Sequence, residues 1–285
     1  MNTALHTQAG FSLTSIPDAM RHMMRWPVAA SLMERWFKAP AYTLSKAQKT
    51  GDAYTPPTYV DESSITMRWA TRFARVQLAC TVLEREWNSP NGLQRLRDLI
   101  RKQELLEGIQ RAYVGGAFDK PQWRFGDLSQ KGSVLDKTCQ VNVREVGQYL
   151  GDPLDEFYGA MGRAILKLAV SGEVSYTQQG KYELLIDTLG FYLRDSYDFN
   201  DDGAWISQPL GYWGPLGVSM TPQMRWDIPI DPYSIADNQY DVHKRYAVQN
   251  DDFASYRKKY QKGGDFIIYS DVLIKRLPQP IKVIL

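Results

Sequence analysis

The 285-residue chain contains few cysteines and histidines, and their positions argue against the sites that these residues usually build. Its two cysteines, Cys80 and Cys139, are far apart in sequence and lack the paired spacing of a zinc site or a redox dithiol. We expect both to be reduced and buried. The histidines His6, His22 and His243 include no pair at the i, i+4 spacing with which a helix face binds a metal. A zinc hydrolase is therefore not expected.

The sequence also lacks long apolar runs and a strong excess of charge. No window reaches the ~18 apolar residues that span a bilayer, and the first fifteen residues show no basic stretch followed by an apolar one. We therefore expect a protein that is made in the cytoplasm without a signal peptide. The 34 basic and 32 acidic residues leave a net charge of +2, so no nucleic-acid partner is expected.

Motifs of several common enzyme classes are missing as well. The chain has no Gly-x-Ser-x-Gly elbow, no phosphate-binding loop and no Gly-x-Gly-x-x-Gly after a strand. What it does have is 44% hydrophobic and 23% charged residues, with eight Trp and seventeen Tyr. These values are typical of a folded globular protein that is rich in aromatic side chains.

The hydrophobic pattern predicts an α+β protein with a helical N-terminal half packed against a strand-rich, antiparallel C-terminal half. Apolar residues recur in steps of three and four from Ile65 to Trp87, which predicts one long helix. A further helix is expected at 155–170, and an extended loop at 40–61. Strands are expected at 174–176, 182–186, 190–194 and 265–274. The expected organisation is a mobile N-terminus at 1–15, a mainly helical region at 16–170 and a β-rich region at 171–285, in one compact unit.

Two short segments each fit a structural and a functional interpretation. An apolar stripe near the N-terminus predicts core packing, with a docking face for a partner protein as the alternative. The stripe consists of Met20, Met23, Met24, Trp26, Trp36 and Phe37. Gly263-Gly264-Asp265 before the last strand predicts a hairpin turn, with a backbone anion nest as the alternative.

The acidic segment 195–203, Asp-Ser-Tyr-Asp-Phe-Asn-Asp-Asp-Gly, is the most informative feature of the sequence. Asp198, Asn200 and Asp202 have the alternate spacing of the first ligands in an EF-hand loop, which predicts a Ca²⁺ site. The position that should supply a bidentate glutamate is Pro209. Only half of the calcium motif is therefore present.

The same segment resembles the signature of the colicin M family, bacteriocins that cleave the lipid II peptidoglycan precursor. That signature is Asp-x-Tyr-Asp, five residues and then His-Arg, and its first half matches Asp195, Tyr197 and Asp198. The resemblance implies a metal-assisted phosphodiesterase. One carboxylate would help to bind Mg²⁺ or activate water, and a basic residue would stabilise the developing charge.

The second half of that signature is absent, because Ala204-Trp205 stands at the His-Arg position. Either the basic residues are His243 or Arg245, or this activity is missing. The structural alternative is an Asx-rich turn in which Asp198 or Asn200 binds its own backbone and Tyr197 fills a gap in the core.

Three further stretches resemble an uncharacterised family that is encoded in proteobacteria near type VI secretion spike and toxin genes. They are residues 16–20 with 26–30, residues 195–199 with 210–213, and residues 263–266. The resemblance implies an effector-like role in competition between bacteria and assigns no catalytic residues. Because type VI cargo is loaded from the cytoplasm, it agrees with the expected lack of a leader.

We therefore predict an antibacterial effector that is delivered to the periplasm of a target cell and attacks a lipid-linked precursor at the membrane surface. Its expected partners are a secretion-spike or adaptor protein and a cognate immunity protein. The predicted catalytic residues are Asp195, Tyr197, Asp198, His243 and Arg245, and the predicted ligands of Mg²⁺ or Ca²⁺ are Asp198, Asn200 and Asp202. The alternative is a non-enzymatic adaptor or immunity protein that binds a toxin or a spike component.

Overall fold

The structure is a computed structural model, and it divides the chain into two compact units. It describes residues 11–110, 113–118, 121–147, 152–202, 207–220, 228–229 and 243–285. Unit 1 comprises the described parts of Met1–Val60, Pro153–Gly162 and Ser196–Ile267, and unit 2 those of Asp61–Asp152, Arg163–Asp195 and Ile268–Leu285. Each unit thus takes residues from both sides of position 170.

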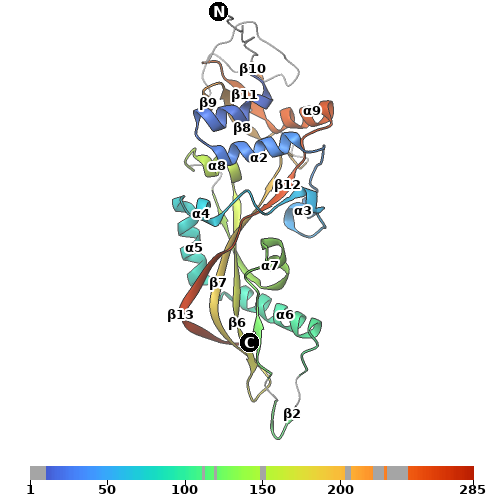
Figure 1. The fold of residues 1–285 in the computed structure, drawn as a ribbon, viewed down its shortest axis with the longest axis vertical. Helices are drawn as coiled ribbons and strands as arrows, with labels where there is room; N and C mark the ends of the chain where they lie inside the picture. The colour runs from blue at the N-terminus through green and yellow to red at the C-terminus, as the bar shows by residue number, and fades with distance from the viewer. Residues whose placement is uncertain are drawn as a thin grey trace, which may run out of the picture. The chain divides into compact units, whose positions relative to one another are not determined.

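Both units contain helices and strands, which confirms the predicted α+β class (Figure 1). Unit 1 has the helices α1 (Ile16–Asp18), α2 (Pro27–Lys38), α3 (Lys46–Thr50), α8 (Glu156–Met161) and α9 (Asn250–Tyr260), and short turns of other helix types at Leu13–Ser15, Ala19–Met23 and Pro57–Tyr59. Its strands β8 (Pro209–Gly214), β9 (Gly217–Ser219), β10 (Ile228–Pro229) and β11 (Tyr246–Gln249) form a sheet in the order β10-β11-β8-β9. Among the described residues, no helix is both long and apolar enough to cross a membrane.

The core of unit 1 is built around the aromatic rings of α2, α9 and the segment that follows strand β7 (Tyr182–Tyr197). Trp36 is fully buried and meets Phe199 edge-on at a centroid distance of 5.1 Å. Phe199 in turn stacks on Phe253 at 3.7 Å. Four members of the N-terminal stripe, Met20, Trp26, Trp36 and Phe37, are buried, which confirms the prediction of core packing for them. Met24 is half-buried and Met23 is exposed.

Gly263 and Gly264 let the chain pass directly over α2. Gly263 has a φ of +96°, and a Cβ atom at this position would lie 2.4 Å from the Trp36 ring. The backbone N–H groups of residues 263–265 donate to carbonyl oxygens of Ala39, Trp36 and Tyr42, so they are not available as an anion nest. The segment crosses a helix and does not form the predicted hairpin turn.

Unit 2 is built on the larger sheet, in which β1-β12-β7-β6-β4 are neighbours in that order, with β13 also on β7 and β5 on β6. The strands are β1 (Val60–Asp61), β4 (Trp123–Phe125), β5 (Gln140–Val146), β6 (Ala164–Tyr176), β7, β12 (Phe266–Tyr269) and β13 (Leu273–Ile284), with a separate pair β2 (Tyr113–Val114) and β3 (Ala117–Phe118). The helices are α4 (Met67–Ala70), α5 (Ala74–Glu86), α6 (Pro90–Leu106) and α7 (Gly132–Thr138). Three of the five boundaries between the units fall within β1, β7 and β12, and the other two lie on either side of α8.

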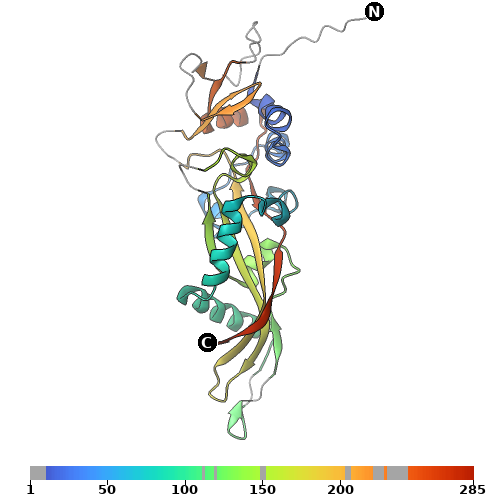
Figure 2. The ribbon, with the colours of Figure 1, turned by 90° about the vertical axis from the view of Figure 1, so that its left-hand side faces the viewer.

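The long strands β6 and β7 pair antiparallel along most of their length (Figure 2). β6 is buried almost throughout, since β5 and β7 flank it and α5 contacts it. The helix predicted at 155–170 is therefore wrong beyond Met161: Gly162 ends α8 with a φ of +53°, and the apolar run that follows is strand β6. A strand that is covered on both faces has a continuous run of apolar residues. The hydrophobic period of such a run does not distinguish a strand from a buried helix.

The long helix predicted from Ile65 to Trp87 is broken into α4 and α5. The Thr71 hydroxyl donates to the Met67 carbonyl at 2.8 Å, and Phe73 adopts an extended backbone that begins α5. Most of the predicted apolar face is still buried, although Phe73 is only half-buried. Of the two free cysteines, Cys139 is buried as predicted, whereas Cys80 on α5 is only half-buried.

A polar network lies inside unit 2 around the Asp136 carboxylate of α7. Its Oδ1 accepts a hydrogen bond from the Tyr192 hydroxyl at 2.6 Å. Its Oδ2 accepts from Lys167 Nζ at 2.7 Å and from the Tyr269 hydroxyl at 2.9 Å. Burial is the largest contribution to the raised pKa of Tyr192 and to the lowered pKa of Lys167. The network thus satisfies buried polar groups that would otherwise destabilise the core.

Candidate functional site

The acidic segment begins with the last three residues of β7, where the chain passes from unit 2 to unit 1. Asp195 is partly buried and belongs to unit 2, whereas Ser196 and the residues after it belong to unit 1. Tyr197, Asp198 and Asp202, the site residues that follow, all belong to unit 1.

Asp198 forms an ion pair with Lys49 of α3. The Lys49 ammonium contacts Asp198 Oδ1 and also lies 3.1 Å from Asp202 Oδ2. The side chains of Lys49 and Asp198 are only 13% and 11% exposed. One ammonium group therefore lies between two carboxylates of the segment, in surroundings largely shielded from water.

Local structure explains why Lys49 reaches this position. The Ser45 hydroxyl caps α3 by accepting from the Gln48 backbone N–H, and the Gln48 side chain accepts from the Ser45 backbone in return. Gly51, with a φ of +89°, ends the helix one turn later. The region predicted as an extended loop thus contains a capped helical turn, which presents Lys49 to the acidic segment.

The surroundings shift the pKa of both partners. Burial raises the pKa of Asp198, and the hydrogen bond from Lys49 opposes this effect only in part. Burial lowers the pKa of Lys49, but the hydrogen bonds and charges of Asp198 and Asp202 outweigh it and leave that pKa above its ordinary value. Lys49 is thus held as a cation, and Asp198 accepts a proton more readily than an exposed carboxylate.

Tyr197 and Asn200 have the roles that the structural alternative predicted. Tyr197 is buried, with its ring stacked on Phe266 at a centroid distance of 5.1 Å. The Asn200 side-chain oxygen accepts from the Asp202 backbone N–H at 3.0 Å, which is an Asx turn. Asp202 completes the turn with a φ of +49°. The turn and the filled gap are confirmed, and a catalytic role of Tyr197 stays a prediction.

A metal ion at Asp198, Asn200 and Asp202 would have to displace Lys49, whose ammonium already lies between the two carboxylates. Within the described ranges, no cluster of three or more His, Cys, Asp or Glu side chains is arranged to hold a metal. The donor set therefore fits Mg²⁺ or Ca²⁺ poorly while Lys49 is in place, and metal binding stays a prediction.

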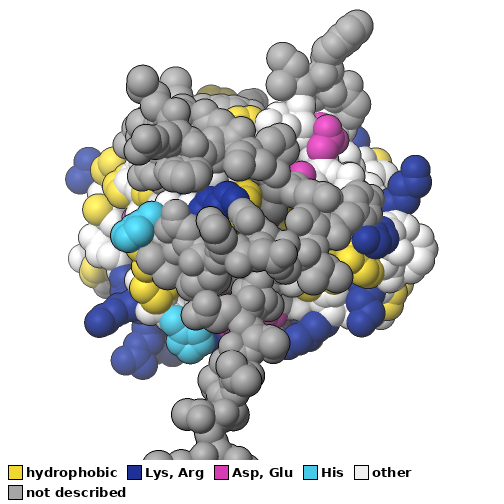
Figure 3. All heavy atoms as spheres, turned by 90° about the horizontal axis from the view of Figure 1, so that it is seen from above, with side chains coloured by type: hydrophobic (Ala, Val, Ile, Leu, Met, Phe, Trp, Pro, Cys, Tyr) yellow, Lys and Arg dark blue, Asp and Glu magenta, His cyan; other side chains and the backbone are white. Residues whose placement is uncertain are grey.

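His243 and Arg245 lie just before β11 in unit 1, and His243 is exposed. Nε and Nη1 of Arg245 are buried without a hydrogen-bond acceptor among the described residues. Burial also lowers the pKa of Arg245. Among the described residues, the Asp198 side chain forms an ion pair with Lys49 and a hydrogen bond with Ser196. Neither His243 nor Arg245 is among its partners. The histidine side chains visible in Figure 3 (cyan) lie apart from each other.

Lys49 is the residue that sequence reasoning missed. It is separated from Asp198 by 149 positions, and no motif links the two. The only local signal is the capping pair Ser45 and Gln48, which predicts the helical turn but not the partner of Lys49.

Comparisons with known proteins identify a family without assigning a role. The model of DUF6402, a family of unknown function, matches residues 11–285. No curated protein and no solved structure matches the chain.

Proposed function

The chain belongs to DUF6402, and we propose that it is an antibacterial effector that acts on the cell envelope as a phosphodiesterase on a lipid-linked peptidoglycan precursor. The observation that carries the proposal is the buried pair of Asp198 and Lys49 next to Tyr197. Hydrolysis of a phosphate ester needs a group that accepts a proton from water and a cation that stabilises the negative charge of the transition state. Asp198 and Lys49 supply one of each.

The proposed reaction begins with exchange of partners at Lys49. A phosphate oxygen of the substrate takes the place of the Asp198 carboxylate on the Lys49 ammonium. Asp198 then lacks its cation in a buried position, which raises its proton affinity and suits it to activate water as a general base. The water oxygen forms a new bond to phosphorus as the phosphate–lipid ester bond breaks, and the proton that Asp198 takes from the water passes to the departing oxygen, so that the lipid leaves as an alcohol. Lys49 meanwhile stabilises the charge that develops on the phosphate.

The other predicted residues have subsidiary places in this proposal. Arg245 is proposed to bind a second phosphate oxygen through the N–H groups that lack an acceptor among the described residues, which requires that these buried groups first become accessible. Asp195 and His243 are proposed as further catalytic residues, and Mg²⁺ or Ca²⁺ as an ion that would enter only after Lys49 moves. Delivery to the periplasm, a secretion-spike or adaptor partner and a cognate immunity protein complete the proposal.

The alternative proposal is a non-enzymatic adaptor or immunity protein. It is supported by the internal hydrogen bonds of the acidic segment. Asp201 accepts hydrogen bonds from Gln208 and Asn250, and Asp198 accepts one from Lys49. A loop with satisfied carboxylates suits a scaffold. On the other hand, the apolar stripe that would dock a partner is mostly core, since Trp36 is fully buried. This burial favours the effector.

Expression in a sensitive bacterium, with and without an added secretion signal, tests the proposal. The unaltered chain is expected to stop growth only when exported to the periplasm. Asp198→Asn and Lys49→Gln should each abolish this toxicity, whereas the exposed controls Asp18→Asn and Lys46→Gln should retain it. Circular dichroism of each purified variant separates lost activity from lost folding.

Two outcomes would contradict the enzymatic proposal. One is growth at the normal rate with the exported, folded chain. The other is full toxicity of a folded Asp198→Asn variant. Normal growth combined with tight co-purification of a co-expressed toxin or spike protein would instead support the alternative.

A further inference from the structure

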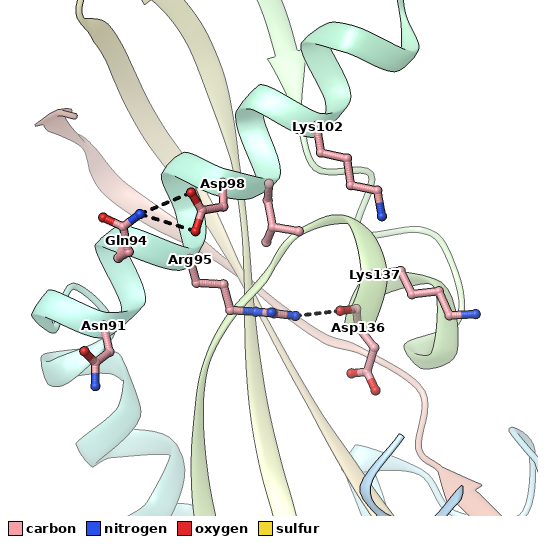
Figure 4. A pocket seen from close by; sticks show the side chains of 8 residues that line it. Asn91, Gln94, Arg95, Asp98, Lys102, Asp136 and Lys137 are labelled. Carbon is pink, nitrogen blue, oxygen red and sulfur yellow. Dashed lines mark hydrogen bonds between the residues drawn. The ribbon is translucent and has the colours of Figure 1, made fainter. Parts of the chain in front are cut away.

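A polar pocket of about 480 Å³ lies between α6 and α7 in unit 2 (Figure 4). Its volume is in the range of sites that bind small molecules, roughly 300–1,000 Å³. It is lined by Asn91, Gln94, Arg95, Asp98, Leu99, Lys102, Asp136 and Lys137. Seven of these eight side chains carry a polar or charged group, and their aliphatic stems leave part of the lining apolar, so the pocket suits a ligand that joins a charged group to a small organic part.

Arg95 is the anchored cation of the pocket. Its Nε donates to the Gln140 carbonyl at 2.7 Å, and its Nη2 donates to the Asp136 carbonyl at 2.9 Å. Both acceptors are neutral, so they orient the guanidinium without cancelling its charge. Of the five N–H donors of an arginine, three are left for a ligand. Figure 4 shows the side chain reaching from α6 to the backbone of Asp136.

The other charges of the pocket leave it positive. Lys102 and Lys137 are exposed, and neither forms an ion pair with any residue in the described ranges. The Asp136 carboxylate is already bound to Lys167 and two tyrosine hydroxyls. In Figure 4 it points away from the hydrogen bond to Arg95. The carboxylate that remains is Asp98, which accepts from Gln94 at 3.1 and 3.3 Å.

We propose that this pocket binds a small phosphate-bearing molecule, with its phosphate on Arg95, Lys102 and Lys137 and a hydroxyl or amine facing Asp98. An oriented guanidinium with two flexible ammonium groups matches the charge and the acceptor oxygens of a phosphate. Asp98 supplies an acceptor for a donor elsewhere on the ligand. The site is independent of Asp198 and Lys49, which belong to unit 1.

Isothermal titration calorimetry of the full chain tests the proposal, with inorganic phosphate and glycerol 3-phosphate as probes. Both should bind saturably, and glycerol 3-phosphate should bind more tightly. Arg95→Gln should weaken both by about 10- to 100-fold, the equivalent of one lost charged hydrogen bond. Asp98→Asn should weaken glycerol 3-phosphate but not inorganic phosphate. Arg101→Gln, an exposed change on the same helix outside the pocket, is the matched control and should bind both probes normally.

A second variant keeps the test valid if Arg95→Gln disturbs the fold, because Arg95 also holds two backbone carbonyls. The double variant Lys102→Gln/Lys137→Gln removes two exposed charges, so its melting temperature should equal that of the wild type. It should bind phosphate more weakly, and its affinity should depend less on the salt concentration. Unaltered binding in this variant, an equal loss in Arg101→Gln, or no saturable binding by the wild type would overturn the proposal.

Vesicles distinguish a free phosphate from a lipid headgroup. The alternative outcome is that the protein shows no heat with the soluble probes and yet sediments with phosphatidylglycerol vesicles but not with phosphatidylcholine vesicles. If that sedimentation requires Lys102 and Lys137, the ligand is an anionic lipid headgroup. That result would overturn the small-molecule proposal. Calorimetric binding without vesicle sedimentation supports it.

Discussion

The ammonium of Lys49 forms a largely buried ion pair with the carboxylate of Asp198, a residue 149 positions away in sequence. The pair joins the helical turn α3 to the acidic segment after β7 within unit 1. A buried carboxylate that loses its cation keeps the cost of desolvation without the compensating attraction. The pair is therefore a structural element of unit 1 whatever its chemistry.

Lys49→Met is expected to lower the free energy of unfolding by about 3 kcal/mol, because it leaves Asp198 buried and unpaired. Urea unfolding followed by tryptophan fluorescence measures the change. Lys46→Met on the same helix is exposed and should change stability by less than about 0.5 kcal/mol. The double variant Lys49→Met/Asp198→Leu should recover most of the loss, and a double variant no more stable than Lys49→Met would contradict the burial argument.

Gly263→Ala is expected to destabilise unit 1 by more than about 2 kcal/mol. Two costs add: a φ of +96° disfavours a side chain, and the new Cβ would lie 2.4 Å from the Trp36 ring. Gly108→Ala separates the two costs, since Gly108 has a φ of +64° with open space around its missing Cβ. It should lose only about 1 kcal/mol, from backbone strain. Equal losses in thermal unfolding would show that Trp36 is not the obstacle.

Tyr192→Phe is expected to cost more stability than Tyr269→Phe, although both hydroxyls bind Asp136. In the described part of the chain, Oδ1 of Asp136 accepts only from Tyr192, whereas Oδ2 also accepts from Lys167. Losing the sole donor should cost about 1–3 kcal/mol, and losing one of two should cost less. Tyr260→Phe, at an exposed position, is the control. The reverse order in chemical denaturation would contradict the described network.

Cys80 is expected to react slowly with iodoacetamide at pH 8. Burial, with a smaller contribution from Glu84, raises the pKa of its thiol to about 11 from an ordinary value of 9.0. Because the thiolate is the nucleophile, a pKa raised by about two units makes the reaction about 100-fold slower at pH 8. The rate should rise with pH and reach half of its maximum near pH 11, which mass spectrometry of the Cys80 peptide measures.

Glu84→Gln removes a negative charge near the thiol, so it should lower the pKa of Cys80 and speed the reaction. Glu86→Gln, an exposed change on the same helix, is the matched control. A rate that reaches half of its maximum near pH 9 in the wild type would show that burial does not govern the Cys80 thiol.

Local patterns in the sequence predicted a large part of the fold. The α+β class, the buried face of residues 65–87 and the buried stripe around Trp36 all follow from the spacing of apolar residues, which helix and strand geometry set within a few positions. The Asx turn at Asn200 is equally local, because its donor and acceptor are two residues apart.

The errors occurred where the burial of a segment depends on distant parts of the chain. The apolar run after Gly162 is compatible with a helix or a strand from its sequence alone. Pairing with β5 and β7 makes it a strand. Gly263 and Gly264 predict a turn from sequence alone, whereas in the structure they allow the backbone to pass close to Trp36. In both cases the deciding contact is made by residues that no local period connects.

The same division holds for the candidate sites. The sequence by itself determined which carboxylates cluster, because Asp198, Asp201 and Asp202 are close neighbours in the chain. Only the tertiary structure decided that Lys49 lies between two of them, and that Arg95, Lys102 and Lys137 share one pocket. The physical reason is that charge attraction acts across space and depends on burial, and neither distance nor burial is defined until the chain has folded.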